Sequence, residues 1–213
     1  MKKIINLKDL LKHEILDLYS AEEQIIEGLP EMIEKAKDSK LKEALSNHLA
    51  VSQTHKTRLD TIKENIIGDE DETDNGFFSS LFGGSNSVTS KGIEGLISEG
   101  NKIMSEDMTD EAMDAAIIAS VQKIGHYEIA GYGTARAYAL ELKLDTVATE
   151  LGTTLSEVYA ADELLTKLAV GQVNPEAENA TDNHEEEQAM DDDYDRLTNS
   201  ISIMSSSDPE SEE

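Results

Sequence analysis

Four polar side chains occupy positions where a helical bundle ordinarily places apolar ones. Each lies on the apolar stripe of a different predicted long helix: Glu22, His55, Glu128 and Glu157. Carboxylates are almost never fully buried unless they are paired. Carboxylate oxygens and imidazole nitrogens are ligands that Fe, Mn and Zn accept from proteins, whereas soft thiolates are absent from this chain. The four residues therefore predict a carboxylate–histidine metal site inside a bundle.

The spacing of these residues from two predicted turns places them at one level of the bundle. Glu22 and His55 lie 16 and 17 residues from the first turn, at Asp38. Glu128 and Glu157, on the other two helices, lie 15 and 14 residues from the second turn, at Lys143. Since an α-helix rises about 1.5 Å per residue, all four stand near the middle of their helices. A single polar residue on such a stripe is more often a boundary residue with its head in water, but four at one level favour a common site.

Apolar residues recur every three or four positions over much of the chain, which is the pattern of helices with one buried face. Four long helices are expected: one that includes Leu7 to Leu29, one after Asp38 that includes Leu41 to Ile66, one from about Asp110 to Glu141, and one after Asp145. A shorter helix is expected near Gly92 to Glu106. No period-two pattern of a β-strand competes with them, so the fold class is all-α.

Individual residues mark helix ends and irregularities. Asn6 and Asp145 are typical N-cap residues, and we expect them to begin the first and fourth long helices. Pro30 should bend the first helix or weaken one of its turns. Gly131 and Gly133 lower the helix propensity of the third helix, so we expect them to permit close approach of a neighbouring helix.

The lengths of the connections predict the topology. Two turns, near Asp38 and Lys143, are short enough to join antiparallel neighbours, whereas the connection from about Gly68 to Thr109 is long. An extended connection of that length can span a bundle about 40 Å long. We therefore predict a ferritin-like four-helix bundle over residues 1–170, made of two antiparallel hairpins joined by a long crossover that carries the short helix.

Two segments differ in composition from the rest of the chain. Residues 171–213 hold 14 acidic residues and one basic residue, so we predict an acidic, disordered tail. It either solubilises the protein or docks onto a partner through residues around Tyr194 to Met204. Residues 68–91 are predicted to form a flexible insertion, and all three phenylalanines lie in its 77–82 region. These aromatic rings either pack onto the bundle or contact a protein partner.

The overall charge excludes one class of partner. A formal net charge of −27 makes nucleic acid an unfavourable ligand, because the phosphate backbone attracts basic surfaces. No run approaches the roughly 18 apolar residues of a membrane span, and the first six residues are too short for the apolar region of a signal peptide. The absence of cysteine fits a reducing compartment. We expect a soluble, cytoplasmic protein without a membrane partner.

The ligand set can be compared with bundles that hold two Fe or Mn ions. Those bundles take one Glu from each of two helices and a Glu-x-x-His pair from each of the other two. Here the pairs are Ser52-x-x-His55 and Glu157-x-x-Ala160, so each keeps one ligand and lacks the other. Six further residues are close enough in sequence to act as additional ligands or to support them: His48, His126, Asp162 and Glu14 as possible metal ligands, with Tyr132 and Gln122 beside them. Glu14 is also an alternative to Glu22 on the first helix.

Three stretches of the chain resemble the YciE/YciF family of bacterial ferritin-like stress proteins. They are Asp9 to Gln24, Leu41 to Leu59 with its two histidines, and His126 to Thr134 with the sequence HYEIAGYGT. The similarity covers about Leu7 to Ala169 and omits the tail. The resemblance implies a rubrerythrin-like fold, a homodimer and a di-metal site. It also implies that the candidate ligands are Glu22, His55, Glu128 and Glu157.

Two functions follow as hypotheses. The first is a di-metal (Fe or Mn) ferritin-like stress protein that reacts with peroxide or oxygen or handles metal; as an enzyme it would be an oxidoreductase. The second is a non-catalytic bundle that contacts partners through the 77–82 loop and the acidic tail. A closed storage cage is less compatible with the insertion and the tail, which would crowd a shell.

Overall fold

The computed structural model describes residues 4–67 and 89–180, and their regular structure is helical. In chain order the elements are α1 (Leu7–Lys35), α2 (Ser39–Ile67), α4 (Lys91–Ile103), α5 (Asp110–Glu141), α6 (Asp145–Leu168), a π-helical segment η1 (Ala169–Val173) and α7 (Asn174–Glu178). None of the helices in this described part is long and apolar enough to cross a membrane.

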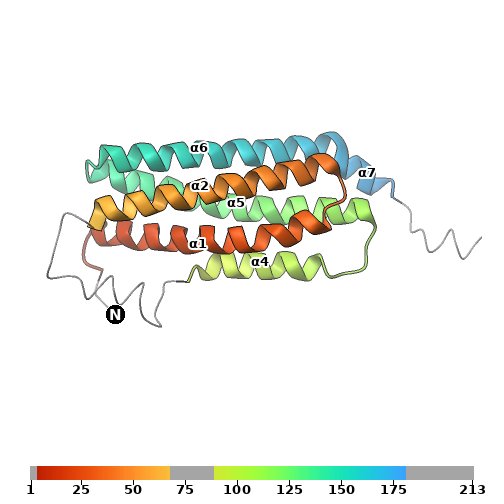
Figure 1. Ribbon diagram of the computed structural model, residues 1–213, viewed down its shortest axis with the longest axis horizontal. Helices are drawn as coiled ribbons and strands as arrows, with labels where there is room; N and C mark the ends of the chain where they lie inside the picture. Colours follow the sequence, from red (N-terminus) through yellow and green to blue (C-terminus); the bar gives the residue numbers. More distant parts are fainter. Residues whose placement is uncertain (1–3, 68–88, 181–213) are drawn as a thin grey trace, which may run out of the picture. The chain divides into compact units, whose positions relative to one another are not determined.

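The four long helices form two antiparallel hairpins. Figure 1 shows α1 and α2 running in opposite directions, and α5 and α6 doing the same, with α4 alongside α1 and α5. The hairpins pack together through α1 against α5 and through α2 against α6. Because α4 runs in the direction of α1, it returns the chain to the end of the bundle where α5 begins. The predicted helical bundle and the short helix in the crossover are confirmed.

The helix starts were predicted with mixed success. The Asn6 side chain accepts a hydrogen bond from the Asp9 backbone N–H at 2.9 Å, so the predicted N-cap of α1 is confirmed. Pro30 lies inside α1, which continues to Lys35. The prediction for α6 was wrong by one residue, because Leu144 is at the N-cap and Asp145 is already helical. The Leu144 carbonyl, directly after the left-handed turn residue Lys143 (φ 58°), already accepts the first hydrogen bond of α6, from the Ala148 N–H at 2.9 Å.

The apolar core is divided into two clusters along the bundle. On α1, Leu18 belongs to one cluster and Ile25 to the other. On α5, the change falls between Ile124 and Tyr132. The level between the clusters is the level at which the sequence places its buried polar residues. A layer of polar side chains therefore lies between two separate apolar packings.

The helical part continues beyond residue 170, where composition predicts the tail to begin. Residues 171–178 lie in η1 and α7, and Val173 is buried in the same apolar cluster as Ile25. The first compact unit accordingly runs from Met1 to Glu178. The predictions for the 77–82 loop and for the segment from Tyr194 to Met204 concern residues outside the described part of the chain.

Gly131 and Gly133 differ in their surroundings, although the sequence predicts the same role for both. A Cβ atom at Gly131 would lie 2.7 Å from a terminal methyl of the buried Leu18, whereas a Cβ at Gly133 would meet nothing within 4 Å. The predicted close approach of α1 is therefore found at Gly131 only.

Alanine should consequently have opposite effects at these two positions. Both substitutions gain up to about 1 kcal/mol of helix propensity. We expect Gly133→Ala to stabilise the protein by about 0.5–1 kcal/mol, and Gly131→Ala to destabilise it by about 1–2 kcal/mol through overpacking. Urea unfolding of both variants provides the comparison, and equal stabilisation by the two would contradict the close approach.

Candidate metal centre

Three buried side chains from three helices meet in the polar layer. Glu22 comes from α1, His55 from α2 and Glu128 from α5, and each is at most 1% exposed. Each offers one ligand atom, and these three atoms all lie within 4.8 Å of one another. Two carboxylates and an imidazole at such distances can converge on a single cation. The structure thus brings together three of the four residues that the sequence singles out first.

The fourth residue, Glu157 on α6, is linked to this group through His55. The imidazole Nδ1 lies 3.1 Å from a Glu22 oxygen, and Nε2 lies 3.1 Å from a Glu157 oxygen. Burial opposes the charged imidazole, but the hydrogen bond to Glu22 and the surrounding carboxylates outweigh it and raise the pKa of His55. A protonated imidazole donates from both nitrogens. The two carboxylates thus favour the protonated imidazole, which has one N–H for each of them.

Glu128 is the least satisfied member of the group. It is fully buried, and neither of its carboxylate oxygens has a hydrogen-bond partner among the described residues. Burial first, and then the nearby charge of Glu22, raise the pKa of Glu128 from 4.5 to about 7, against the opposing effect of His48 and His55. A carboxyl group with this pKa is partly protonated at neutral pH. A bound cation would favour its ionised form.

Other polar atoms near the group also lack partners. They are the second oxygen of Glu22, Nδ1 of His48 and the hydroxyl of Ser52, and all three side chains are buried. Buried polar groups are nearly always hydrogen-bonded, so such a concentration needs a physical account. The donor set of carboxylate oxygen and imidazole nitrogen fits a borderline or hard transition-metal ion. The residues present therefore fit the metal that the sequence suggests.

Tyr132 holds one ligand in place. Its hydroxyl donates to Glu22 at 2.7 Å, and its ring meets that of His55 in an edge-to-face contact with centroids 6.0 Å apart. Burial and the charges of Glu22 and Glu128 raise the pKa of Tyr132 well above its usual value, so the phenol stays protonated and keeps donating. Tyr132, predicted from the sequence to support the ligands, thus both hydrogen-bonds Glu22 and packs against His55.

Arg58 and Thr154 belong to the site although sequence reasoning did not select them. Arg58 donates to the Thr154 hydroxyl at 2.5 Å and to a Glu157 oxygen at 2.8 Å. The guanidinium outweighs the partial burial of Glu157 and lowers the pKa of its carboxyl group. Arg58 follows His55 by three residues, one helical turn, and this spacing was the available signal.

Loss of this guanidinium should destabilise the bundle. We expect Arg58→Met to lower the free energy of unfolding by about 1–2 kcal/mol at pH 7, a modest value because the Glu157 side chain is 39% exposed. Because the Arg58 guanidinium depresses the pKa of Glu157 below 4.5, this loss should become smaller as the pH falls through the pKa of the folded protein and the carboxyl group is protonated. Arg136→Met on the exposed side of α5 serves as the control, and an equal loss from both variants would argue against a specific role of Arg58.

The additional candidate ligands fall into two groups. His48 lies beside the centre, with Nε2 3.8 Å from a Glu128 oxygen. His126 and Asp162 instead form a separate pair, 3.6 Å apart, in which the His126 side chain is 67% exposed. Gln122 donates to Asp162 at 3.0 Å and so belongs to that pair.

Glu14 is half-buried two turns from Glu22, next to Gly131. Burial and the neighbouring Asp17 raise its pKa. Within the described residues, Glu22 rather than Glu14 joins the metal-binding group.

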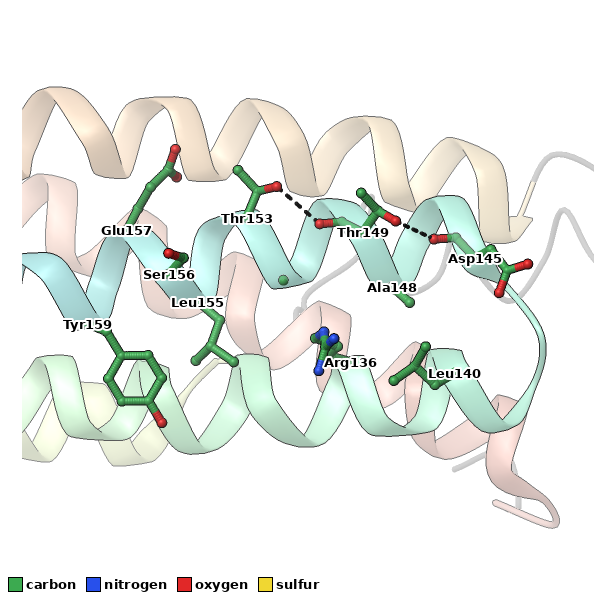
Figure 2. Close-up of a pocket in the computed structure, with 11 residues that line it drawn as sticks. Arg136, Leu140, Asp145, Ala148, Thr149, Thr153, Leu155, Ser156, Glu157 and Tyr159 are labelled. Atoms are coloured by element: carbon green, nitrogen blue, oxygen red, sulfur yellow. Dashed lines mark hydrogen bonds between the residues drawn. The ribbon is translucent and has the colours of Figure 1, made fainter.

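A cavity of about 730 Å³ lies on the other side of α6, between α5 and α6. Figure 2 shows that Arg136 and Leu155 face this cavity, whereas the Glu157 side chain points toward α2. The hydroxyls of Thr149 and Thr153 donate to backbone carbonyls of their own helix. These two hydroxyls are therefore already satisfied by their own helix, and the cavity lacks the converging carboxylates and imidazoles of the buried layer.

Comparisons with known proteins cover the same helical unit. A family model described as "Domain of unknown function (DUF892)" matches residues 6–178. The chain is 34% identical over 173 residues to Protein YciF of Escherichia coli (strain K12), which covers 81% of this chain and 96% of that protein.

Two solved structures are also similar. One is YcfI from Rhodopseudomonas palustris, with 36% identity, a TM-score of 0.65 and coverage of 78% of this chain and 96% of that one. The other is the crystal structure of the E. coli stress protein YciF, with 32% identity, a TM-score of 0.68 and coverage of 80% and 99%. The similarity thus includes all the helices that supply the buried polar layer.

Proposed function

Because this chain belongs to the YciF family of proteins with a domain of unknown function (DUF892), we propose that it is a ferritin-like stress protein that binds Fe or Mn. The ligands are Glu22, His55 and Glu128, with His48 beside them. The observation that carries this proposal is the set of buried carboxylate oxygens without a hydrogen-bond partner in the described structure, one on Glu22 and two on Glu128. A cation would give all three oxygens a partner at once.

The charges in the polar layer favour one ion per chain. Glu157 already has a cationic partner, because the Arg58 guanidinium lies 2.8 Å from its carboxylate. A second metal ion near Glu157 would have to displace that guanidinium and would find Ser52 where the two-ion pattern has a glutamate. Glu22 and Glu128 have no comparable cationic side chain, apart from the histidines that would themselves become ligands. A mononuclear centre therefore uses the available donors best.

An Fe or Mn ion bound by carboxylate and imidazole supplies redox chemistry with peroxide or oxygen. The protein's own residues prepare the surroundings. Tyr132 orients Glu22 through its hydrogen bond, and the two apolar clusters exclude water above and below the layer. His55 releases its extra proton when one of its nitrogens becomes a ligand, since only the neutral imidazole binds metal. Glu157 lies 3.1 Å from Nε2 near the surface, and its depressed pKa keeps it an ionised hydrogen-bond acceptor that orients the imidazole.

Metal content tests the proposal. After expression in medium supplemented with iron and manganese, we expect about one Fe or Mn per chain by elemental analysis. Glu128→Ala and His55→Ala should each reduce it at least tenfold, because each removes a buried ligand. Glu163→Gln, on the exposed side of α6, is the matched control and should retain the metal. A folded wild-type protein that remains metal-free under these conditions would overturn the proposal and favour the interaction function.

A further inference from the structure

We propose that a groove between α2 and α6 is the route to the buried centre, and that it selects small uncharged molecules of the size of hydrogen peroxide or dioxygen. The role as a substrate route rests on the proposed function. Whether the groove is open to small molecules can be tested in metal-free protein, so the proposed route and the proposed function can be disproved separately.

The groove is a cavity of about 280 Å³ whose lining comes from α2 and α6. Both imidazoles of the centre, His48 and His55, line it, together with the half-exposed Glu157. His48 is 6% exposed, and its Nδ1 has no hydrogen-bond partner in the described structure. Its other nitrogen lies 3.8 Å from the Glu128 carboxylate. The inner end of the groove is therefore the metal-binding group itself.

The opposite side of the bundle is closed. There α1 and α5 approach so tightly at Gly131 that a single added methyl group would overlap Leu18. Glu22 and Glu128, which come from these two helices, are 0% exposed. Between α2 and α6, by contrast, the lining near the imidazoles includes small side chains, Ala160 and Ala161. Small residues on this face leave space that larger side chains fill elsewhere.

The chemistry of the lining determines what can pass. Apart from the imidazoles, Glu157 and Asn47, the lining residues are apolar, among them Val51, Leu164 and Leu165. An anion would approach the carboxylates of the centre and would lose hydration without a compensating partner. The volume admits a molecule of few atoms and excludes a peptide or nucleotide. Val51 on α2 and Ala161 on α6 line opposite walls and are the positions at which a change of side-chain size should alter the width of the passage.

A single introduced thiol can report on this route. The chain contains no cysteine, and Ser52 is fully buried on α2 between His48 and His55. Ser52→Cys is nearly isosteric and places one thiol behind the groove. In chelator-treated protein, we expect this thiol to react with uncharged methyl methanethiosulfonate at a rate unaffected by low urea. Charged methanethiosulfonates of either sign should react at least tenfold more slowly.

Substitutions that narrow or widen the groove should then change the rate of thiol labelling in opposite directions. In the Ser52→Cys background, Ala161→Leu should slow the reaction at least tenfold and Val51→Ala should accelerate it severalfold. Ala137→Leu, on the exposed face of α5, should leave the rate unchanged. Circular dichroism and urea unfolding identify any variant that has lost its fold, and Val51→Ala provides the opposite-sign test if Ala161→Leu is unstable.

Two outcomes would overturn the route. One is a labelling rate that rises with urea in parallel with unfolding, which would mean that the thiol is reached only through opening of the bundle. The other is a rate insensitive to both groove substitutions. Metal content of the wild-type protein is measured separately, so a metal-free wild type together with the expected labelling of the variants would contradict the proposed function and leave the route intact.

Discussion

Replacing Glu128 with glutamine should stabilise the metal-free protein by about 3 kcal/mol at pH 8 and have little effect near pH 4. The pKa of Glu128 rises from 4.5 to about 7 on folding, because burial and the charge of Glu22 disfavour its ionised form. One pKa unit corresponds to about 1.4 kcal/mol. Glutamine keeps the shape of the protonated acid and cannot ionise, so it avoids this cost at high pH.

The pH window follows from the direction of the shift. Because the pKa of Glu128 is higher in the folded protein, the folded protein binds this proton more tightly than the unfolded chain does. The resulting stability is fully present below pH 4.5 and is lost as the pH rises to about 7. Folding also raises the pKa of His55. The stability that this proton contributes is likewise lost as the pH rises through the pKa of His55 in the folded protein. The metal-free wild-type protein should therefore lose stability across this range.

Urea unfolding with a chelator, at pH 4, 6 and 8, measures the difference between the two proteins. Glu163→Gln is the control, because this exposed carboxylate on α6 pairs only with Lys167 at the surface. We expect its effect to be small at every pH. A Glu128→Gln variant that is less stable than wild type at pH 8 would contradict an ionised, unpartnered carboxylate in the metal-free core.

A bound metal ion should reverse this pH dependence. At a free Mn²⁺ concentration 100 times the dissociation constant, binding should stabilise the folded protein by about 2.7 kcal/mol. The apparent affinity should rise by more than tenfold per pH unit at pH 6, because the ion displaces both the proton of Glu128 and the extra proton of His55, and the slope should fall as the pH rises past 7. The metal-loaded protein thus gains stability in the range where the metal-free protein loses it.

Isothermal titration calorimetry at pH 6, 7 and 8 tests this expectation. Repeating the titration in buffers of different ionisation enthalpy counts the protons released on binding. We expect about two protons at pH 6, one from Glu128 and one from His55, and fewer at pH 8. Binding that is equally tight from pH 6 to 8, with no proton release, would show that the ion does not reach Glu128.

The topology and the centre of the site could be predicted because both depend on regular spacing. Helical periodicity places Glu22, His55 and Glu128 on buried stripes, and short turns set them at one depth. The resemblance to the YciE/YciF family is also confirmed by a relative that is 34% identical over most of the chain. These predictions required only which face of each helix is buried and how many residues separate each candidate ligand from the nearest turn.

Residues near the ligands in sequence were harder to judge. His126 precedes Glu128 by two positions, which is about 200° around a helix, so it faces solvent when Glu128 is buried. Asp162 follows Glu157 by five and likewise lies on another face. The angle alone could have excluded His126 from the centre.

Arg58 could not be assigned from spacing alone. Its long side chain lets the guanidinium reach Thr154 and Glu157 on α6 from a position at the edge of α2. The sequence specifies where that side chain begins but not where its charged end lies. The pairing depends on the rotation of α2 relative to α6, which is a property of packing rather than of either helix.

The division of the core has a consequence for how such a protein can evolve. Each apolar cluster packs several helices together on its own side of the polar layer. The positions of the helices are therefore fixed on both sides of that layer. Substitutions within the layer then alter the chemistry without removing the packing that specifies the fold. Ser52 and Ala160 stand where the two-ion pattern has ligands, and the helices that carry them pack in the same bundle. Scaffold and site can therefore diverge at different rates, and one bundle can carry different sets of ligands over time.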